Sequence, residues 1–153
     1  MTDELIVLVE DNDDDVFFMR RALKGAGINA PVEVLTDGQQ ATDYLTGAGQ
    51  FADRAHFPLP GIVFLDLKLP YCTGFEVLEA MRKKGTLGQM RVVILTSSPE
   101  ERDRRRAREL GAAAYLVKPP TPTMLKQLFS ALSEPDNSAG ELSFGGGGAG
   151  GGS

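Results

Sequence analysis

The 153-residue chain is poor in two residue types on which many functions depend. Its single cysteine, Cys72, excludes an internal disulfide framework and is typical of a protein kept in a reducing cytosol. Its single histidine, His56, lies in the stretch FADRAHFPLP, which indicates a loop. We therefore interpret His56 as a surface or packing residue rather than a catalytic one.

Long apolar stretches and an excess of positive charge are missing as well. The apolar run LIVLV is too short for the core of a signal peptide, and no stretch approaches the roughly 20 apolar residues of a membrane span. The formal net charge of -5 argues against nucleic-acid binding driven by phosphate contacts. We expect a soluble, cytoplasmic protein whose partners include no membrane and no nucleic acid.

Short apolar runs alternate with segments of helical spacing. The runs cover residues 5–9, 61–66, 91–96 and 112–117, and a more alternating one covers 32–36. Continuous runs of this length are typical of parallel strands that are covered on both faces. Strand and helix repeat five times, which predicts an α/β fold with a flavodoxin-like, doubly wound, five-stranded parallel sheet of order 2-1-3-4-5 and helices on both faces.

The carboxyl-terminal segment differs in composition from the rest of the chain. From about residue 133 onward it is rich in glycine and has little to bury. This composition predicts one folded domain over residues 1–133 and a flexible glycine-rich tail over 134–153. The residues leave open whether the tail is natural or engineered.

Polar residues of complementary chemistry follow or end the predicted strands: Glu10 and Asp11, Asp66, Thr96, and Lys118. In a doubly wound sheet the ligand site lies at the carboxyl ends of the strands, so these side chains should meet there. Three carboxylates would repel one another without a cation, and hard oxygen ligands suit Mg²⁺. A metal with an ammonium and a hydroxyl nearby can receive a phosphoryl group, with Asp66 as its nucleophile.

The stretch VEDNDDDVFF divides into two acidic features. Glu10 and Asp11 end a buried strand and are assigned to the metal site. Residues 13–15 are three aspartates that begin a helix, where carboxylates are favoured by the exposed N–H groups and the macrodipole. With Asn12 as the cap, we interpret these three aspartates as solvated and not as metal ligands.

Four segments together resemble the receiver domain of two-component response regulators: VLVEDN, IVFLDLKLPYCTGFEVL, VVILTSS and GAAAYLVKPP. They occur in the family's order over residues 4–132, with the acidic pair, the aspartate, the hydroxyl residue and the lysine at strand ends. The opening VEDNDDDVFFMRRAL, together with the long segment before the third strand, is most similar to stand-alone, chemotaxis-regulator-like members that partner phytochrome-type and related sensor kinases.

The resemblance implies roles for the acidic residues. Asp66 would be the phosphoacceptor, and Asp11 and Asp66 would bind Mg²⁺ through their side chains. Glu10 would bind it mainly through water and Lys68 through its backbone carbonyl. In this family the residues two positions after the phosphoacceptor and the hydroxyl residue, here Lys68 and Ser98, tune how long the phosphoryl group survives, so that lifetime stays open.

The resemblance also implies how the signal is made. Lys118 would pair with the phosphoryl oxygens, and the peptide bond before Pro119 would be cis. Thr96 would hydrogen-bond the phosphoryl group, and Tyr115 would move inward as the coupled aromatic switch. The arginine-rich run 101–109 is either a solvated helix with internal ion pairs or part of a homodimer face formed by helix four, strand five and helix five.

The predicted function is that of a single-domain response regulator, phosphorylated on Asp66 by a sensor histidine kinase in a Mg²⁺-dependent reaction. It would not be an enzyme that turns over external substrates. One alternative is a docking module that keeps the fold without phosphorylation. Another is a Mg²⁺-dependent phosphatase, against which Lys68 argues, because such enzymes usually carry an acid at that position.

Overall fold

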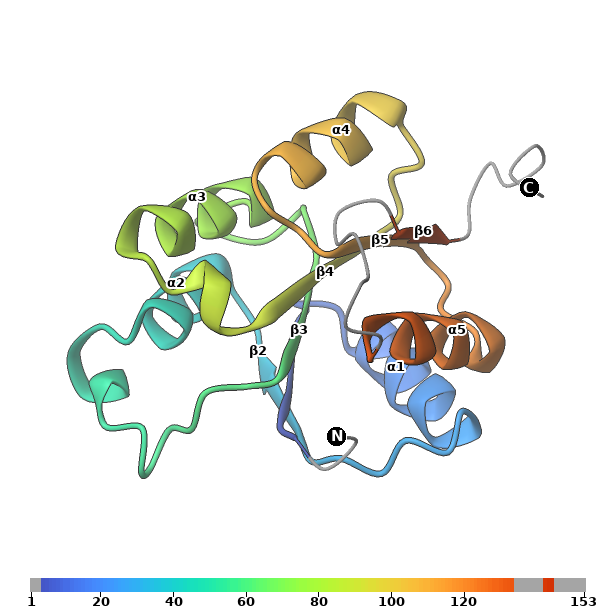
Figure 1. The fold of residues 1–153 in the computed structure, drawn as a ribbon, viewed down its shortest axis with the longest axis horizontal. Coiled ribbons are helices and arrows are strands. Elements are labelled where there is room, and N and C mark those ends of the chain that lie inside the picture. The colour runs from blue at the N-terminus through green and yellow to red at the C-terminus, as the bar shows by residue number, and fades with distance from the viewer. Residues whose placement is uncertain (1–3, 134–141, 145–153) are drawn as a thin grey trace.

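A computed structural model describes residues 4–133 and the backbone of 142–144 (Figure 1). Its central strands are all parallel and lie in the order β2-β1-β3-β4-β5. The bounds are β1 Ile6–Val9, β2 Val32–Leu35, β3 Ile62–Leu65, β4 Arg91–Thr96 and β5 Ala114–Val117. The predicted strand order is therefore confirmed.

A short sixth strand, β6 (Leu142–Phe144), lies parallel to β5 and extends the sheet. We had predicted five strands and assigned these three residues to the tail. The outer edge of a five-stranded sheet leaves the N–H and C=O groups of β5 unpaired, and a segment of extended backbone can pair with them. Three residues are too few for a hydrophobic period to show. The other tail residues, 134–141 and 145–153, lie outside the described part of the chain.

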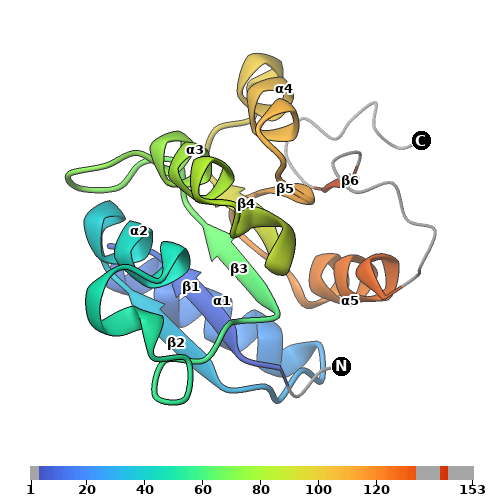
Figure 2. The same ribbon diagram turned by 60° about the vertical axis from the view of Figure 1, so that its left-hand side comes forward.

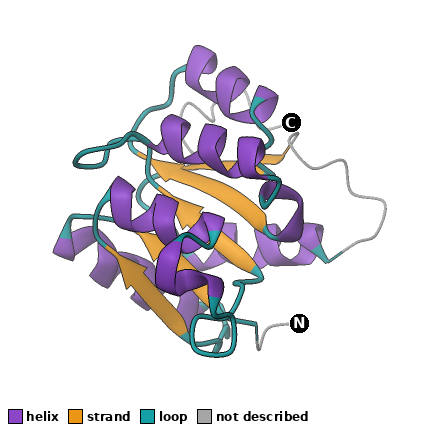
Figure 3. Cartoon of the chain, turned by 90° about the vertical axis from the view of Figure 1, so that its left-hand side faces the viewer, coloured by secondary structure: helices purple, strands orange, loops and turns teal. Residues whose placement is uncertain are grey.

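Helices cover both faces of the sheet, which Figures 2 and 3 show between its two helical layers. One layer holds α1 and α5, and the other holds α2, α3 and α4. Short 3₁₀ helices, η1 and η2, lie in two connections. The bounds are α1 Asp13–Gly25, α2 Gly38–Thr46, η1 Gly49–Ala52, α3 Gly74–Lys84, η2 Leu87–Gln89, α4 Glu101–Glu109 and α5 Pro122–Leu132.

Successive residues of a strand enter opposite cores, because side chains alternate across the sheet. Val7 and Val9 of β1 pack in the core beneath α2 and α3. Ile6 and Leu8 pack in the core beneath α1 and α5. All four are buried, so the apolar runs reflect a sheet covered on both sides, as predicted.

The connection between α2 and β3 is held by aromatic contacts. The ring centroid of Tyr44 lies 5.2 Å from that of Phe51 and 6.3 Å from that of Phe57. The Tyr44 hydroxyl donates to the Pro58 carbonyl at 2.8 Å. His56 is exposed in this connection, and its Nδ1 lies 2.6 Å from Asp53 Oδ2. The interpretation of His56 as a surface residue is therefore confirmed.

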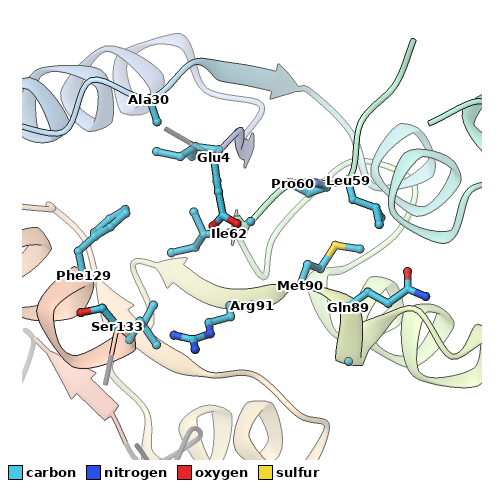
Figure 4. A pocket seen from close by; sticks show the side chains of 14 residues that line it. Glu4, Ala30, Leu59, Pro60, Ile62, Gln89, Met90, Arg91, Phe129 and Ser133 are labelled. Atoms are coloured by element: carbon cyan, nitrogen blue, oxygen red, sulfur yellow. The ribbon is translucent and has the colours of Figure 1, made fainter. Parts of the chain in front are cut away.

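A cleft of about 590 Å³ lies at the amino ends of the strands (Figure 4). The first residues of β1, β3 and β4 line it, together with the end of α5. The side chains of Glu4 and Arg91 reach its rim and are exposed. Among the described residues no helix has the length and apolar character needed to cross a membrane.

Candidate functional site

The carboxyl ends of the strands bring the predicted site residues together. Glu10 follows β1, Asp66 follows β3, Thr96 ends β4 and Lys118 follows β5. The register pairs Val9 with Leu65, which places Glu10 beside Asp66. Tyrosines aside, Glu10, Asp66 and Thr96 are the buried polar side chains of the described chain, at 2%, 7% and 0% exposure.

Three carboxylates form a cluster that could hold a metal ion. Oxygens of Glu10, Asp11 and Asp66 all lie within 4.8 Å of one another, with Asp11 on the solvent side. Glu10 Oε1 is buried, and the Lys118 ammonium lies beside it. Burial, reinforced by the charge of Asp66, raises the pKa of Glu10 to about 6, although Lys118 opposes the shift. This set of oxygen donors fits Mg²⁺, which relieves such repulsion.

Lys118 supplies the positive charge of the site. Its Nζ lies 2.8 Å from Asp66 Oδ2, 2.8 Å from Asp15 Oδ2 and 2.6 Å from Glu10 Oε1. Burial alone would lower the pKa of Lys118, but hydrogen bonds to Asp15 and Asp66 outweigh burial and hold that pKa above its ordinary value. Lys118 is therefore an ammonium ion placed directly on the candidate phosphoacceptor.

The three aspartates that begin α1, residues 13–15, differ in burial and in their contacts. Asn12 Oδ1 accepts from the Asp15 N–H at 2.9 Å, so the predicted cap is confirmed. Asp13 and Asp14 are exposed, as expected. Asp15, however, is half-buried and accepts a hydrogen bond from Lys118, so its interpretation as a solvated residue was wrong. Lys118, the partner of Asp15, lies 103 positions later in the sequence. Nothing in the sequence indicates this contact, because an aspartate in the first turn of a helix is already explained by its local environment.

Thr96 and Tyr115 are both connected to Ser98. Thr96 is fully buried, and its Oγ1 lies 3.5 Å from the Ser98 N–H group that points to it. The Tyr115 hydroxyl donates to the Ser98 carbonyl at 2.8 Å, and the ring is 3% exposed. Burial raises the pKa of Tyr115. The Arg104 guanidinium lies 5.0 Å from the ring centroid. Sequence reasoning named Ser98 only for phosphoryl lifetime and did not see this link.

The loop after β3 holds Asp66 in place. Asp66 Oδ1 accepts from the Lys68 N–H at 3.2 Å, and the Lys68 side chain is exposed. The Gly74 N–H donates to the Leu67 carbonyl at 3.0 Å, and a Cβ at Gly74 would overlap the backbone of Asp66. A glycine is therefore required where α3 begins. At the far side of the site the peptide bond before Pro119 is cis, as the resemblance implied.

The arginine-rich helix α4 makes contacts within the chain. Arg102 pairs with Glu100 at 2.9 Å. Arg106 lies over the Phe75 ring at 4.4 Å from its centroid and 3.4 Å from Glu79, both on α3. The helix thus pairs with its own N-cap residue and also packs against α3. The homodimer face stays a prediction.

Comparison with known proteins agrees with this geometry. Residues 6–130 match the model of the response regulator receiver domain family. The chain is 36% identical over 133 residues to the probable methanogenesis regulatory protein FilR2 of Methanothrix harundinacea, which covers 85% of this chain and 81% of that protein. It is 34% identical over 129 residues to response regulator Rcp1 of Synechocystis, which covers 84% of each.

Solved structures agree as well. The bacteriophytochrome response regulator RtBRR has a TM-score of 0.73 and 39% identity, covering 86% of this chain and 78% of that one. The Mn²⁺-bound form of response regulator Rcp1 has a TM-score of 0.71 and 31% identity, and the match covers 86% of this chain and 96% of that one. The predicted likeness to regulators of phytochrome-type kinases is confirmed. The chain belongs to the receiver-domain family of two-component response regulators.

Proposed function

We propose that the chain is a single-domain response regulator that accepts a phosphoryl group from a sensor-kinase phosphohistidine onto Asp66. The reaction depends on Mg²⁺, and phosphorylation is reported by a conformational switch. One observation carries the proposal: three carboxylates converge within 4.8 Å while the Lys118 ammonium lies 2.8 Å from Asp66. A strand-end aspartate that only stabilised the fold would need no second and third carboxylate beside it.

The metal would be held by the acidic cluster. Asp11 and Asp66 would bind Mg²⁺ through their side chains, Glu10 mainly through water, and Lys68 through its backbone carbonyl. When bound, Mg²⁺ neutralises the carboxylates and the phosphoryl oxygens. The convergence of oxygens from Glu10, Asp11 and Asp66 within 4.8 Å of one another is the observation that fits this role.

The chain's own residues would perform the transfer as follows. An Asp66 oxygen attacks phosphorus, and the phosphorus–nitrogen bond to the imidazole breaks as the new phosphorus–oxygen bond forms. Lys118 pairs with the phosphoryl oxygens and offsets their charge. The turn held by Gly74 fixes the Asp66 backbone, so that the carboxylate is oriented before the donor arrives.

The switch would start at Thr96. Its hydroxyl would turn to the phosphoryl oxygens, away from the Ser98 N–H that it now faces at 3.5 Å. The carbonyl of the same Ser98 accepts from Tyr115. A shift of this loop would therefore change the position of Tyr115 by altering the populations of two existing states.

The proposed kinase partner is of the phytochrome type, because bacteriophytochrome response regulators are among the similar structures. A homodimer through α4, β5 and α5 is proposed as one output of the switch. Tyr115 on β5 and Arg104 on α4 belong to that face and contact each other. The dimer would follow from phosphorylation.

Phosphorylation is tested by incubating the full chain with a small phosphodonor and Mg²⁺, followed by intact mass spectrometry. We expect one phosphoryl adduct that is absent with a chelator and absent in Asp66→Asn. No adduct on the folded wild-type chain would favour a phosphorylation-independent docking module. Release of many equivalents of phosphate per chain would favour a phosphatase.

A further inference from the structure

We propose that Asp15 is a positioning residue for Lys118, a role that rests on the proposed function of the site. Asp15 Oδ2 accepts a hydrogen bond from Lys118 Nζ at 2.8 Å, the same distance that separates this nitrogen from Asp66 Oδ2. The ammonium thus has one carboxylate partner on α1 in addition to the two at strand ends. Charge-assisted hydrogen bonds of this length are the strong ones in proteins.

The backbone of α1 holds Asp15 in position. Its N–H is capped by Asn12 Oδ1 at 2.9 Å, and Asn12 follows the acidic pair directly. Lys118 is 12% exposed and the Asp15 side chain is 33% exposed, so the contact is shielded on the lysine side. Asp14, one residue earlier in the same turn, is exposed and is not among the carboxylates that pair with Lys118. The two aspartates share their charge and the first turn of α1 but differ in this contact.

Asp15 lies outside the group that would hold the metal. The cluster whose oxygens converge consists of Glu10, Asp11 and Asp66. A divalent cation there would compete with Lys118 for Glu10 and Asp66, and the two positive charges would repel each other. Of the three carboxylates that pair with Lys118, only Asp15 lies outside the metal-binding group, so it would remain a partner of Lys118 when the metal is bound.

Two consequences follow for the reaction. With Asp15 present, Lys118 can shift toward α1 when the metal binds, which frees oxygens of Glu10 and Asp66. The lysine also stays at the rim of the site, ready to pair with the incoming phosphoryl group. Without Asp15 the ammonium would remain on the metal-binding carboxylates, which would weaken metal binding and slow transfer.

The test compares Asp15→Ala with Asp14→Ala, which removes the same charge from the same turn. Mg²⁺ alone is titrated into each full-length chain, and its dissociation constant is read from amide chemical shifts of residues 11 and 68. We expect Asp15→Ala to raise this constant roughly three- to tenfold, and Asp14→Ala to change it by less than about twofold, because an exposed charge is screened. Asp15→Glu should restore part of the affinity.

A double-mutant cycle with Lys118→Met separates positioning from a direct effect of charge. If Asp15 acts through Lys118, Asp15→Ala will have no larger effect than Asp14→Ala once Lys118 is replaced. An undiminished effect in that background would overturn the proposal, as would equal effects of the two alanine variants in the wild-type background. Should Lys118→Met fail to fold, Lys118→Gln serves in the cycle.

A second readout is the initial rate of phosphorylation at saturating Mg²⁺ and small phosphodonor. We expect Asp15→Ala to lower this rate several-fold and Asp14→Ala to leave it unchanged; equal rates for both would contradict the positioning role. If the wild-type chain accepts no phosphoryl group, the proposed function fails. The Mg²⁺ titration still decides whether Asp15 positions Lys118.

Discussion

The two ends of the sheet are built from the same strands but carry different chemistry. At the carboxyl ends, Glu10, Asp66 and Thr96 are buried polar side chains, and Lys118 joins the two acids. At the amino ends, charged groups such as Glu4 and Arg91 are exposed around a cleft lined by apolar side chains. Four residues of β1 or β3 separate one end from the other.

The amino end follows the ordinary partition of apolar side chains inward and charges outward, which packing alone explains. The carboxyl end departs from it, because burying a charge is costly unless it is paired. A fold stabilises such a group only if its neighbours compensate, and here Lys118 pairs with both Glu10 and Asp66. The contrast locates function at one end of the sheet, and the following substitutions test it.

The largest effect is expected from removing the nucleophile. Asp66→Asn should lower phosphorylation by a small phosphodonor by more than about 1000-fold, since a neutral amide lacks the nucleophilic carboxylate oxygen. Glu4→Gln, the same chemical change at the amino end, should leave the rate unaltered. Intact mass spectrometry over time measures both. A phosphoryl adduct on Asp66→Asn would move the acceptor to another residue.

The second effect is on stability. Lys118→Ala leaves Glu10 and Asp66 buried without a counter-charge, and it should lower the free energy of unfolding by about 3 kcal/mol at neutral pH without Mg²⁺. Arg91→Ala removes an exposed cation at the amino end and should cost less than about 0.5 kcal/mol. Urea unfolding followed by circular dichroism measures each. Equal losses of unfolding free energy would mean that the carboxyl end does not depend on a buried counter-charge more than the amino end does.

The site residues that end strands could be predicted, and those that reach it from a helix could not. Glu10, Asp66, Thr96 and Lys118 each interrupt or follow an apolar run, and parallel strands bring such positions to one edge. Asp15 lies in a helical turn, where a carboxylate is expected for local reasons. Only the fold reveals that Lys118, 103 residues away, contacts it.

The Tyr115 hydrogen bond and the strand β6 could not be predicted either, because neither follows from the spacing of apolar residues in the sequence. The bond from Tyr115 to the Ser98 carbonyl depends on the path of a loop, since a buried tyrosine needs some partner but its sequence does not name one. The strand β6 depends on the free edge of β5, which exists only once the sheet has formed. The core, by contrast, followed directly from the apolar runs.

The third effect is the pH dependence of stability, whose direction follows from the raised pKa of Glu10. Its pKa in the folded chain is about 6, above the ordinary value of 4.5. The folded state therefore binds this proton more tightly than the unfolded state, and the contribution of Glu10 to stability falls as pH rises from 4.5 to 6. Relative to Glu10→Gln, the wild-type chain should lose roughly 2 kcal/mol of unfolding free energy over that window without Mg²⁺.

The Glu10 prediction is checked by urea unfolding at pH values from 4 to 7 in the presence of a chelator. Mg²⁺ affinity should weaken as pH falls through about 6, because the proton and the metal compete for the same carboxylate. Glu10→Gln should lack this component of the pH dependence. A stability difference that is constant with pH, or that grows in favour of the wild type as pH rises, would contradict the raised pKa.

The smallest effect compares two tyrosines that make the same bond at opposite ends of the sheet. Tyr115 donates to Ser98 beside the site, and Tyr44 donates to Pro58 next to the cleft, both at 2.8 Å. Both rings are buried, and an arginine guanidinium lies over each. Arg104 is 5.0 Å from the Tyr115 ring centroid, and Arg54 is 5.6 Å from that of Tyr44. Each Tyr→Phe substitution leaves one carbonyl without its donor and should therefore cost about 1 kcal/mol of stability.

The two substitutions should differ in function although they agree in stability. Only Tyr115 shares Ser98 with Thr96, so Tyr115→Phe should reduce the chemical-shift change that phosphorylation causes at residues 98 to 104 of the loop and α4. Tyr44→Phe should leave that change intact, because its hydrogen bond joins α2 to the connection before β3. Equal attenuation by both variants would mean that general loosening, rather than the Ser98 link, carries the signal. A response altered by Tyr115→Phe alone would assign the switch to the carboxyl end, where the buried charges already lie.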